Sequence, residues 1–334
     1  MRIGNTAETL TTLYADEATR HRAVMLMGAS GIGKSAAVYQ MAEKLELPVI
    51  DLRLAQCDPT DLRGVPNVVD GRTYWNVPSF FPDPKASPAG ILFLDEITSA
   101  PPSVQAIAYQ LVLDRAQGEY KLPDGWMIVL AGNRQNDRGV TFAMAAPLMN
   151  RMTILEIDTV LDDVLDYGAQ NGLDPRVMAF VSDRADLLHK FDKDSYGQQF
   201  PTPRGWFAVS DKLPLSFDAT TRVELLKGDV GHEAAVAFEQ FLRVWETMPS
   251  ITKIFETPEE VEVPKELNVR YCVAMGLSAR MDKDNFNNAW KYVKRLPREF
   301  QTLIVKLAYQ RDNSLLQATS FAEWALANKD AFKR

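Results

Sequence analysis

Residues 28–35 read GASGIGKS, a run of mostly small residues that ends in a lysine and a serine. The stretch before it, RAVMLM at 22–27, is short and mostly apolar, and SAAVYQMAEKLEL at 35–47 carries apolar groups at helical spacing. The pattern therefore predicts a strand, a glycine-rich loop and a helix, in that order. In such a loop the backbone N–H groups turn inward around an anion, which larger side chains would obstruct.

The loop matches the pattern G-x-x-x-x-G-K-[ST], which predicts a site for the phosphates of a nucleotide. Lys34 would reach the outer phosphates, Ser35 would ligate Mg²⁺ through its hydroxyl, and the following helix would point its positive N-terminus at the site. An ordinary glycine-rich turn is the alternative, but the predicted strand and helix on either side argue against it. The expected nucleotide-binding residues are Gly28, Ala29, Ser30, Gly31, Ile32, Gly33, Lys34, Ser35 and Asp95.

A second motif, GILFLDE at 90–96, is an apolar run that ends in two acids. The carboxylate of Asp95 at the end of this strand would hold the magnesium together with Ser35, and Glu96 beside it would orient an attacking water. Two acids after a strand are a weak signal alone, but the phosphate loop upstream strengthens it. A kinase would not need the glutamate beside the metal ligand, so the pair favours hydrolysis.

Three further apolar runs predict the rest of an α/β core. Continuous rather than alternating hydrophobicity is typical of strands covered on both faces, so we expect a parallel sheet wrapped by helices. Hairpins are predicted over 68–77 and 118–126, a helix over 101–115, and a short helix over 142–151 that Pro147 breaks. After residue 158 the patterns are helical. The strands are predicted at 22–27, 48–54, 90–96, 126–133 and 152–158.

The length and composition of the chain narrow the range of domain organisations and functions to be considered. The chain has 334 residues, which fits two or three domains, and its formal net charge of −7 argues against nucleic acid as the main partner. Its two cysteines, Cys57 and Cys272, lie far apart in the sequence, which favours a reducing cytoplasm over a disulfide framework. No apolar run approaches the length of a membrane span.

Over residues 20–215 the motifs of this chain resemble those of the AAA+ ATPases, and among them those of the MoxR and dynein-related group. The resemblance implies a nucleotide-binding core over 1–158 with the two hairpins as inserts, a helical lid over 159–255 and a helical C-terminal extension over 256–334. The helical sequence from about 216 to 334 is longer than the simple lid of the family. The motifs that carry the resemblance are DLRGVP, YWNVPSFFP, GILFLDEITSAPPSVQ, GEYKLPDGWMIVLAGN and PLMNRMTILEID.

The resemblance also implies the remaining catalytic positions. Asn133 would be the first sensor, Arg151 the arginine finger offered to a neighbouring subunit, and Arg204 a second sensor that grips the γ-phosphate. The alternative for Arg151 is an exposed arginine with a purely structural role, an ion pair with Asp158. Three further arginines lie near the expected subunit edge, and the sequence does not rank them as helpers of the finger: Arg115, Arg134 and Arg138.

By this resemblance the chain is an ATPase that uses ATP and Mg²⁺, forms a homo-oligomeric ring, expected as a hexamer, and remodels or matures protein partners. It has no von Willebrand-type pattern of its own, so a separate partner would carry one. Two alternatives stay open: a nucleotide-switched scaffold with slow turnover, and a DNA-handling AAA+ motor or loader. Lys121 and Arg72 are the obvious hairpin cations for the DNA alternative.

Overall fold

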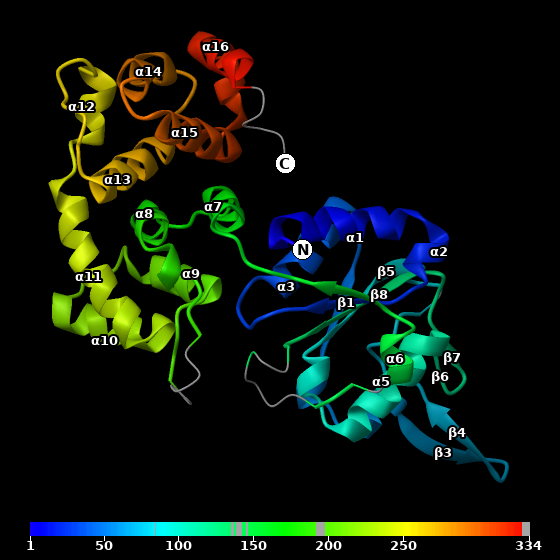
Figure 1. The fold of residues 1–334 in the computed structure, drawn as a ribbon. Helices are drawn as coiled ribbons and strands as arrows, with labels where there is room; N and C mark the ends of the chain where they lie inside the picture. The colour runs from blue at the N-terminus through cyan, green and yellow to red at the C-terminus, as the bar shows by residue number, and fades with distance from the viewer. Residues whose placement is uncertain (84, 135–136, 138–141, 145, 192–197, 329–334) are drawn as a thin grey trace. The chain divides into compact units, whose positions relative to one another are not determined.

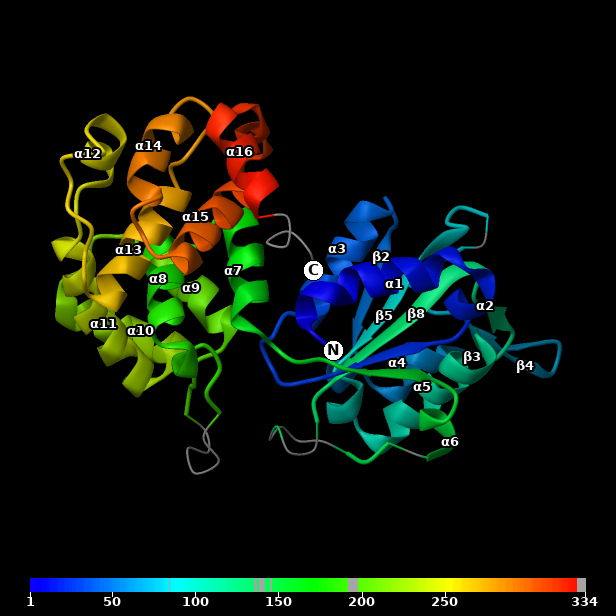
Figure 2. The ribbon, with the colours of Figure 1, turned by 45° about the horizontal axis from the view of Figure 1, so that its top comes forward.

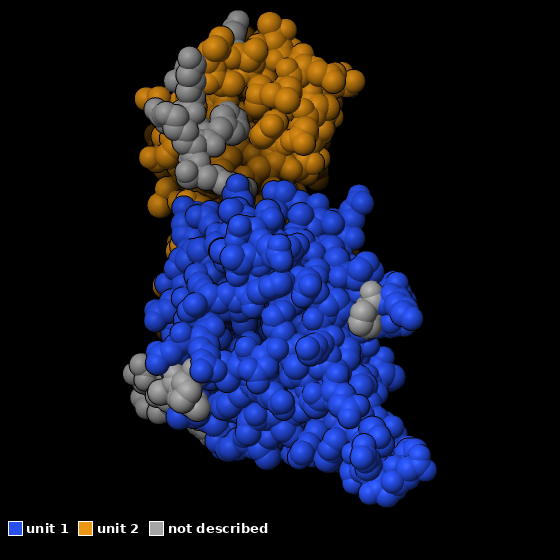
Figure 3. Space-filling model, turned by 90° about the vertical axis from the view of Figure 1, so that its right-hand side faces the viewer, with its two compact units in different colours: residues 1–159 blue, residues 160–334 orange. Residues whose placement is uncertain are grey.

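The computed structural model describes residues 1–83, 85–134, 137, 142–144, 146–191 and 198–328. The chain divides into two compact units, Met1–Thr159 and Val160–Arg334, which Figure 3 shows in different colours. Among the described residues, all named strands belong to the first unit and the named elements of the second unit are helices.

A five-stranded parallel sheet forms the centre of the first unit. Its order is β2-β5-β8-β1-β9, and every neighbouring pair is parallel. The strands coincide with the five runs predicted from hydrophobicity, which confirms the expected α/β core. They are β1 (Val24–Met27), β2 (Val49–Arg53), β5 (Ala89–Asp95), β8 (Gly125–Gly132) and β9 (Thr153–Glu156).

Helices cover both faces of this sheet (Figure 1, Figure 2). Leu92 and Leu94 of β5 join one hydrophobic cluster with α5, whereas Ile91 and Phe93 join another with α1 and α3. Successive side chains of a strand point to opposite faces, so a sheet buried on both sides needs the unbroken apolar runs seen in the sequence. The α-helices are α1 (Thr6–Ala15), α2 (Glu17–Arg20), α3 (Lys34–Lys44), α4 (Pro59–Arg63), α5 (Pro102–Asp114) and α6 (Ala146–Met149). The 3-10 helices are η1 (Ile3–Asn5), η2 (Leu54–Gln56) and η3 (Ile97–Ser99).

The helix expected over 142–151 is shorter than the sequence suggested. It is α6, and Pro147 lies in its first turn rather than breaking it. A proline is tolerated there because the first-turn N–H groups have no partner within the helix.

Both predicted hairpins exist, but their bounds were wrong. The first pairs β3 (Val65–Val69) with β4 (Arg72–Asn76), so its first strand begins before residue 68. Its Asp-Gly turn has positive φ at both central residues, 51° and 74°, as a type I′ turn requires. The second pairs β6 (Ala116–Gln117) with β7 (Tyr120–Lys121) and ends well before residue 126, because residues 125 and 126 already belong to β8.

The second unit contains two hydrophobic clusters that meet at α13. Cys272 and Met275 belong to one cluster, and Val273 and Leu277 to the other. The predicted division into a lid and a C-terminal extension at residue 255 stays a prediction. The helices are α7 (Leu161–Gln170), α8 (Pro175–Asp183), η5 (Ala185–Leu187), α9 (Pro203–Lys212), α10 (Ala219–Val230), α11 (His232–Thr247), α12 (Ile251–Glu256), α13 (Leu267–Ser278), α14 (Phe286–Val293), α15 (Arg298–Arg311), η6 (Asn313–Gln317) and α16 (Thr319–Ala327).

In the described part of the chain, no helix combines the length and the apolar character that crossing a bilayer requires.

The buried strand β5 offers a test of this core. Phe93 is fully buried, so Phe93→Ala should lower the free energy of unfolding of the first unit by about 3–5 kcal/mol through lost burial and a cavity. Val68 on the first hairpin is 68% exposed, and Val68→Ala should change stability by less than about 0.5 kcal/mol. Urea titration measures both. Equal losses in the two variants would contradict the burial of β5 in the core of the first unit.

Candidate functional site

The glycine-rich loop connects β1 to α3. The Gly28 N–H donates to the carbonyl of Gly132 at 3.2 Å, and a Cβ on Gly28 would lie 2.6 Å from the carbonyl oxygen of Ile157. Gly33 precedes the helix with φ of +101°, and no side chain of a described residue caps that end. The amide dipoles of the first turn of α3 therefore remain available to an anion at the end of the loop.

Lys34 is the first residue of α3, and its side chain bends back over the loop. Its ammonium donates to the carbonyl oxygens of Gly28 at 2.7 Å and Ala29 at 2.8 Å, and to Oδ1 of Asn133 at 3.1 Å. The residue is only 9% exposed. These three oxygens carry no net charge, whereas a phosphate would bring full negative charge to a buried cation and form stronger, charge-assisted bonds.

Ser35 and Asp95 meet beside the lysine. The Ser35 hydroxyl donates to Oδ2 of Asp95 at 3.2 Å, and Oδ1 of Asp95 accepts the N–H of Glu96 at 2.8 Å. A hydroxyl and a carboxylate are ligands that Mg²⁺ accepts, and this ion usually takes its other ligands from water and phosphate. Among the described residues no group of three or more His, Cys, Asp or Glu side chains could hold a metal. The hydroxyl of Ser35 and the carboxylate of Asp95 fit a magnesium ion that arrives with a nucleotide.

Glu96 follows Asp95 and turns the chain out of the sheet into η3. Its backbone is left-handed, with φ of 58° and ψ of 31°, and its side chain is exposed. A non-glycine residue rarely adopts this conformation, and such strain concentrates at functional sites. The glutamate is thus held next to the Asp95 carboxylate, and its side chain is accessible to water.

Asn133 follows the last residue of β8 and joins this group through Lys34. Its backbone N–H donates to Oγ1 of Thr98 at 3.0 Å. Thr98 was missed by the sequence analysis, although it is the first polar residue after the acidic pair.

The parallel sheet explains this convergence. Strands β1, β5 and β8 are neighbours and run in the same direction, so the residues after their carboxyl ends gather at one edge. The structure brings together Lys34, Ser35, Asp95 and Asn133 there, with Glu96 adjacent.

Residues 23–152 match the family model of the AAA domain, dynein-related subfamily. They form an AAA domain of this subfamily. Domains of this family bind nucleotides, and their members are generally ATPases that oligomerise. The matched range contains the loop lysine, both acids, Asn133 and Arg151.

Solved structures similar to the chain include the RuvB Holliday junction branch migration motor of Thermotoga maritima, with 16% identity, a TM-score of 0.36 and 86% of each chain covered. A RuvB mutant from the same organism has 16% identity and a TM-score of 0.42, again with 86% of each chain covered. NtrX from Brucella abortus, in complex with ADP, has 14% identity and a TM-score of 0.40, and the match covers 97% of this chain and 68% of the NtrX chain. A search of curated proteins gave no match.

Arg151 lies at the amino-terminal ends of the parallel strands, whereas the phosphate loop lies at their carboxyl-terminal ends. It precedes β9, and the register pairs Thr153 with Val24 and Glu156 with Met27. The four residues of β9, at about 3.3 Å each, place Arg151 roughly 13 Å from the carboxyl edge. No described residue hydrogen-bonds or pairs with its exposed guanidinium. Arg151 is therefore far from the site of its own domain.

The other candidate arginines of this domain are engaged within their own chain. Arg115 donates to the carbonyls of Pro123 at 3.0 Å and Trp126 at 2.6 Å, and burial lowers its pKa. Arg134 donates to Asp158 at 2.7 Å, and this hydrogen bond is the main cause that raises the pKa of Arg134 and lowers that of Asp158. Asp158 thus pairs with Arg134, not with Arg151. Arg138 lies outside the described residues.

Arg204 belongs to the second unit. It is the second residue of α9, where the Thr202 hydroxyl accepts the N–H of Gly205 at 3.0 Å, and Trp206 is fully buried. The helix is thus fixed on its buried side, while Arg204 is exposed, and no described residue pairs with its guanidinium.

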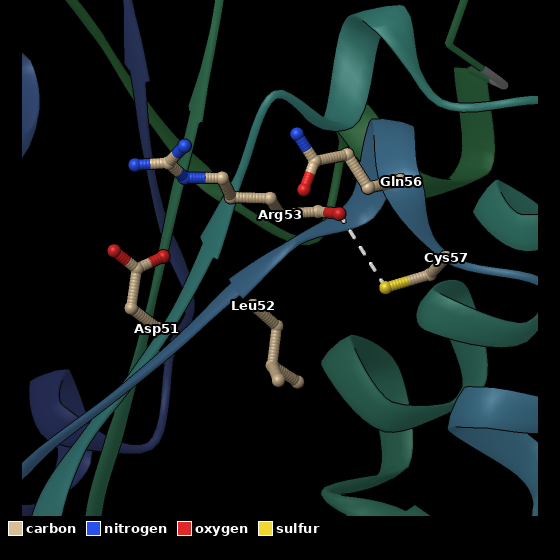
Figure 4. A pocket seen from close by; sticks show the side chains of 5 residues that line it. All are labelled: Asp51, Leu52, Arg53, Gln56 and Cys57. Atoms are coloured by element: carbon tan, nitrogen blue, oxygen red, sulfur yellow. Dashed lines mark hydrogen bonds between the residues drawn. The ribbon is translucent and has the colours of Figure 1, made fainter.

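A pocket lies along β2 and η2, beside the strand that carries Asp95 (Figure 4). The Cys57 thiol donates to the carbonyl oxygen of Arg53 at 3.4 Å, and burial raises its pKa. A protonated thiol is a weak nucleophile, so this pocket has no activated cysteine. Its lining residues are Asp51, Leu52, Arg53, Gln56 and Cys57.

The lysine of the loop gives the first test of the site. Lys34→Ala should weaken ATP binding roughly 10- to 100-fold, because charge-assisted hydrogen bonds to phosphate are lost. Lys44→Ala, at the exposed last turn of the same helix, is the matched control and should bind as the parent does. Isothermal titration calorimetry measures both. Equal affinity of Lys34→Ala and the parent would refute the phosphate role.

Proposed function

We propose that this chain is a Mg²⁺-dependent ATPase that forms a ring, MoxR-like in type, and remodels or matures protein partners. The observation that carries the proposal is the contact of Lys34 with Asn133 beside the Ser35–Asp95 pair. These groups supply a cation for phosphate, a metal-ligating pair and a polar sensor at one edge of the sheet. The family match of residues 23–152 supports the same reading.

Each residue has a distinct part in the proposed reaction. Lys34 neutralises charge on the outer phosphates, and Ser35 and Asp95 hold the magnesium ion. That ion, when bound, supplies positive charge to the phosphoryl oxygens. Glu96 accepts a hydrogen bond from the attacking water and orients it, and Asn133 positions the γ-phosphate or that water. The exposed carboxyl of Glu96 suits this part, because water must reach it.

The position of Arg151 supports the proposed ring. Its side chain is exposed, and its backbone lies about 13 Å along β9 from the end of the sheet that holds the site of its own chain, which suits the proposed role of a finger for the nucleotide of a neighbouring copy. A cation supplied in trans stabilises the charge of the transition state. Catalysis then depends on assembly, and we propose a homo-hexamer on the basis of the family resemblance.

The helical half completes the proposal. We assign residues 159–255 to a lid that offers Arg204 to the γ-phosphate, and residues 256–334 to an extension. The client is a protein, reached with a separate von Willebrand-type adaptor, rather than nucleic acid, which agrees with the net charge of −7. Cys57 and Cys272 are both free thiols, which is compatible with work in the cytoplasm.

The role of Glu96 separates an ATPase from a nucleotide-switched scaffold. Glu96→Gln should keep ATP affinity but lower kcat by roughly 100-fold or more, because the water loses its orienting base. Glu46→Gln is the matched control, since Glu46 is also exposed and left-handed, with φ of 53°. Steady-state phosphate release measures kcat. Parental turnover in Glu96→Gln would exclude the water-orienting role, and very slow turnover in the parent would favour the scaffold.

Mixing two variants tests whether Arg151 acts as an arginine finger on the nucleotide of a neighbouring subunit. Arg151→Ala subunits keep their own site but offer no finger, and Glu96→Gln subunits offer the finger but cannot hydrolyse. Mixing the two should therefore restore ATPase activity that neither shows alone. Arg243→Ala is the matched control, because Arg243 is an exposed arginine of α11. Subunits with this change should keep parental ATPase activity without being mixed with another variant. Absence of rescue at every ratio would count against a trans contribution.

A further inference from the structure

Thr98 is a buried polar residue that the proposed reaction does not yet use. It is 3% exposed and lies in η3, directly after the turn made by Asp95 and Glu96. Its hydroxyl accepts the N–H of Asn133 at 3.0 Å, and its carbonyl oxygen accepts the N–H of Phe142 at 2.7 Å. Thr98 thus holds the chain at two points that follow the end of β8, Asn133 and Phe142.

Packing reinforces the hydrogen bond. A Cβ on Gly132 would lie 2.6 Å from Cγ2 and 2.8 Å from Oγ1 of Thr98, so Thr98 fills the space directly beside the end of β8. The hydroxyl and the methyl group therefore have separable tasks. The methyl group occupies volume, while the hydroxyl fixes the backbone of Asn133.

The side chain of Asn133 extends this connection to the phosphate loop. Its Oδ1 accepts the ammonium of Lys34 at 3.1 Å. A shift of the Asn133 backbone would move the amide relative to Lys34, and a small displacement of a positioned group is costly for catalysis.

We propose that Thr98 is a positioning residue for ATP hydrolysis, which acts through Asn133 by holding its backbone N–H. This inference rests on the proposed function. It adds that one short segment, residues 95–98, sets the metal carboxylate, the water-orienting glutamate and the sensor amide in register with one another. A threonine or serine is required at residue 98 because the hydroxyl oxygen must accept a hydrogen bond.

Two substitutions separate the hydroxyl from the methyl group. Thr98→Val keeps the shape but not the acceptor, and should lower kcat roughly 10-fold while the Kd for ATP stays within about twofold. Thr98→Ser keeps the acceptor, and should retain at least about half of the parental kcat. Thr11→Val is the control, because the Thr11 hydroxyl bonds to the Ala7 carbonyl within α1 and should not affect turnover.

A double-mutant cycle shows whether Thr98 acts through Asn133. In an Asn133→Ala background, Thr98→Val should cause no additional loss of kcat, whereas independent effects would multiply. Hydrogen exchange at the Asn133 amide should also be faster in Thr98→Val than in the parent, and unchanged in Thr11→Val.

The outcomes distinguish the two claims. A parental chain without ATPase activity would overturn the proposed function, and this inference would fall with it. An active chain in which Thr98→Val keeps parental kcat, or in which its effect multiplies with that of Asn133→Ala, would overturn the inference alone. Loss in both Thr98→Val and Thr98→Ser would assign Thr98 to packing and equally overturn it.

Discussion

The hydrogen bond between the Lys34 ammonium and Oδ1 of Asn133 joins the two segments on which the site depends. Lys34 opens the helix after β1, and Asn133 follows β8, so residues 99 positions apart meet only if these strands lie side by side. Parallel pairing of β1 and β8 imposes that meeting. The rest of the site is arranged around it, because β5 on the other side of β8 delivers Asp95 to the same edge.

The shared direction of the strands also determines where the arginines of the first unit lie. Residues after a strand gather at the phosphate edge, while Arg151, which precedes β9, is carried to the far edge. Arg115 donates to the carbonyls of Pro123 and Trp126, and Arg134 donates to the carbonyl of Ile157, so both side chains are engaged within their own chain. This separation is the physical basis on which we propose that Arg151 serves the site of a neighbouring subunit.

Much of the fold was predictable because the decisive signals are local. Unbroken apolar runs such as GILFLD identify doubly covered strands, and the glycine spacing identifies the loop between β1 and α3. The predicted hairpin bounds were wrong because the strands are short, and those of the first hairpin, β3 and β4, are mostly exposed and carry little hydrophobic pattern. Pro147 was misinterpreted because its position within a helical turn is not visible in the sequence. The contact of Thr98 with Asn133 depends on strand packing, so no local pattern could reveal it. Likewise, only the folded chain shows that Asp158 pairs with Arg134.

The most direct measurement is an experimental structure of the full chain with Mg²⁺ and a non-hydrolysable ATP analogue. We predict that the Lys34 ammonium leaves the Gly28 and Ala29 carbonyls for the outer phosphates, and that the Ser35 hydroxyl ligates the metal near Asp95. An analogue bound elsewhere, or bound while Lys34 keeps both carbonyl contacts, would contradict it.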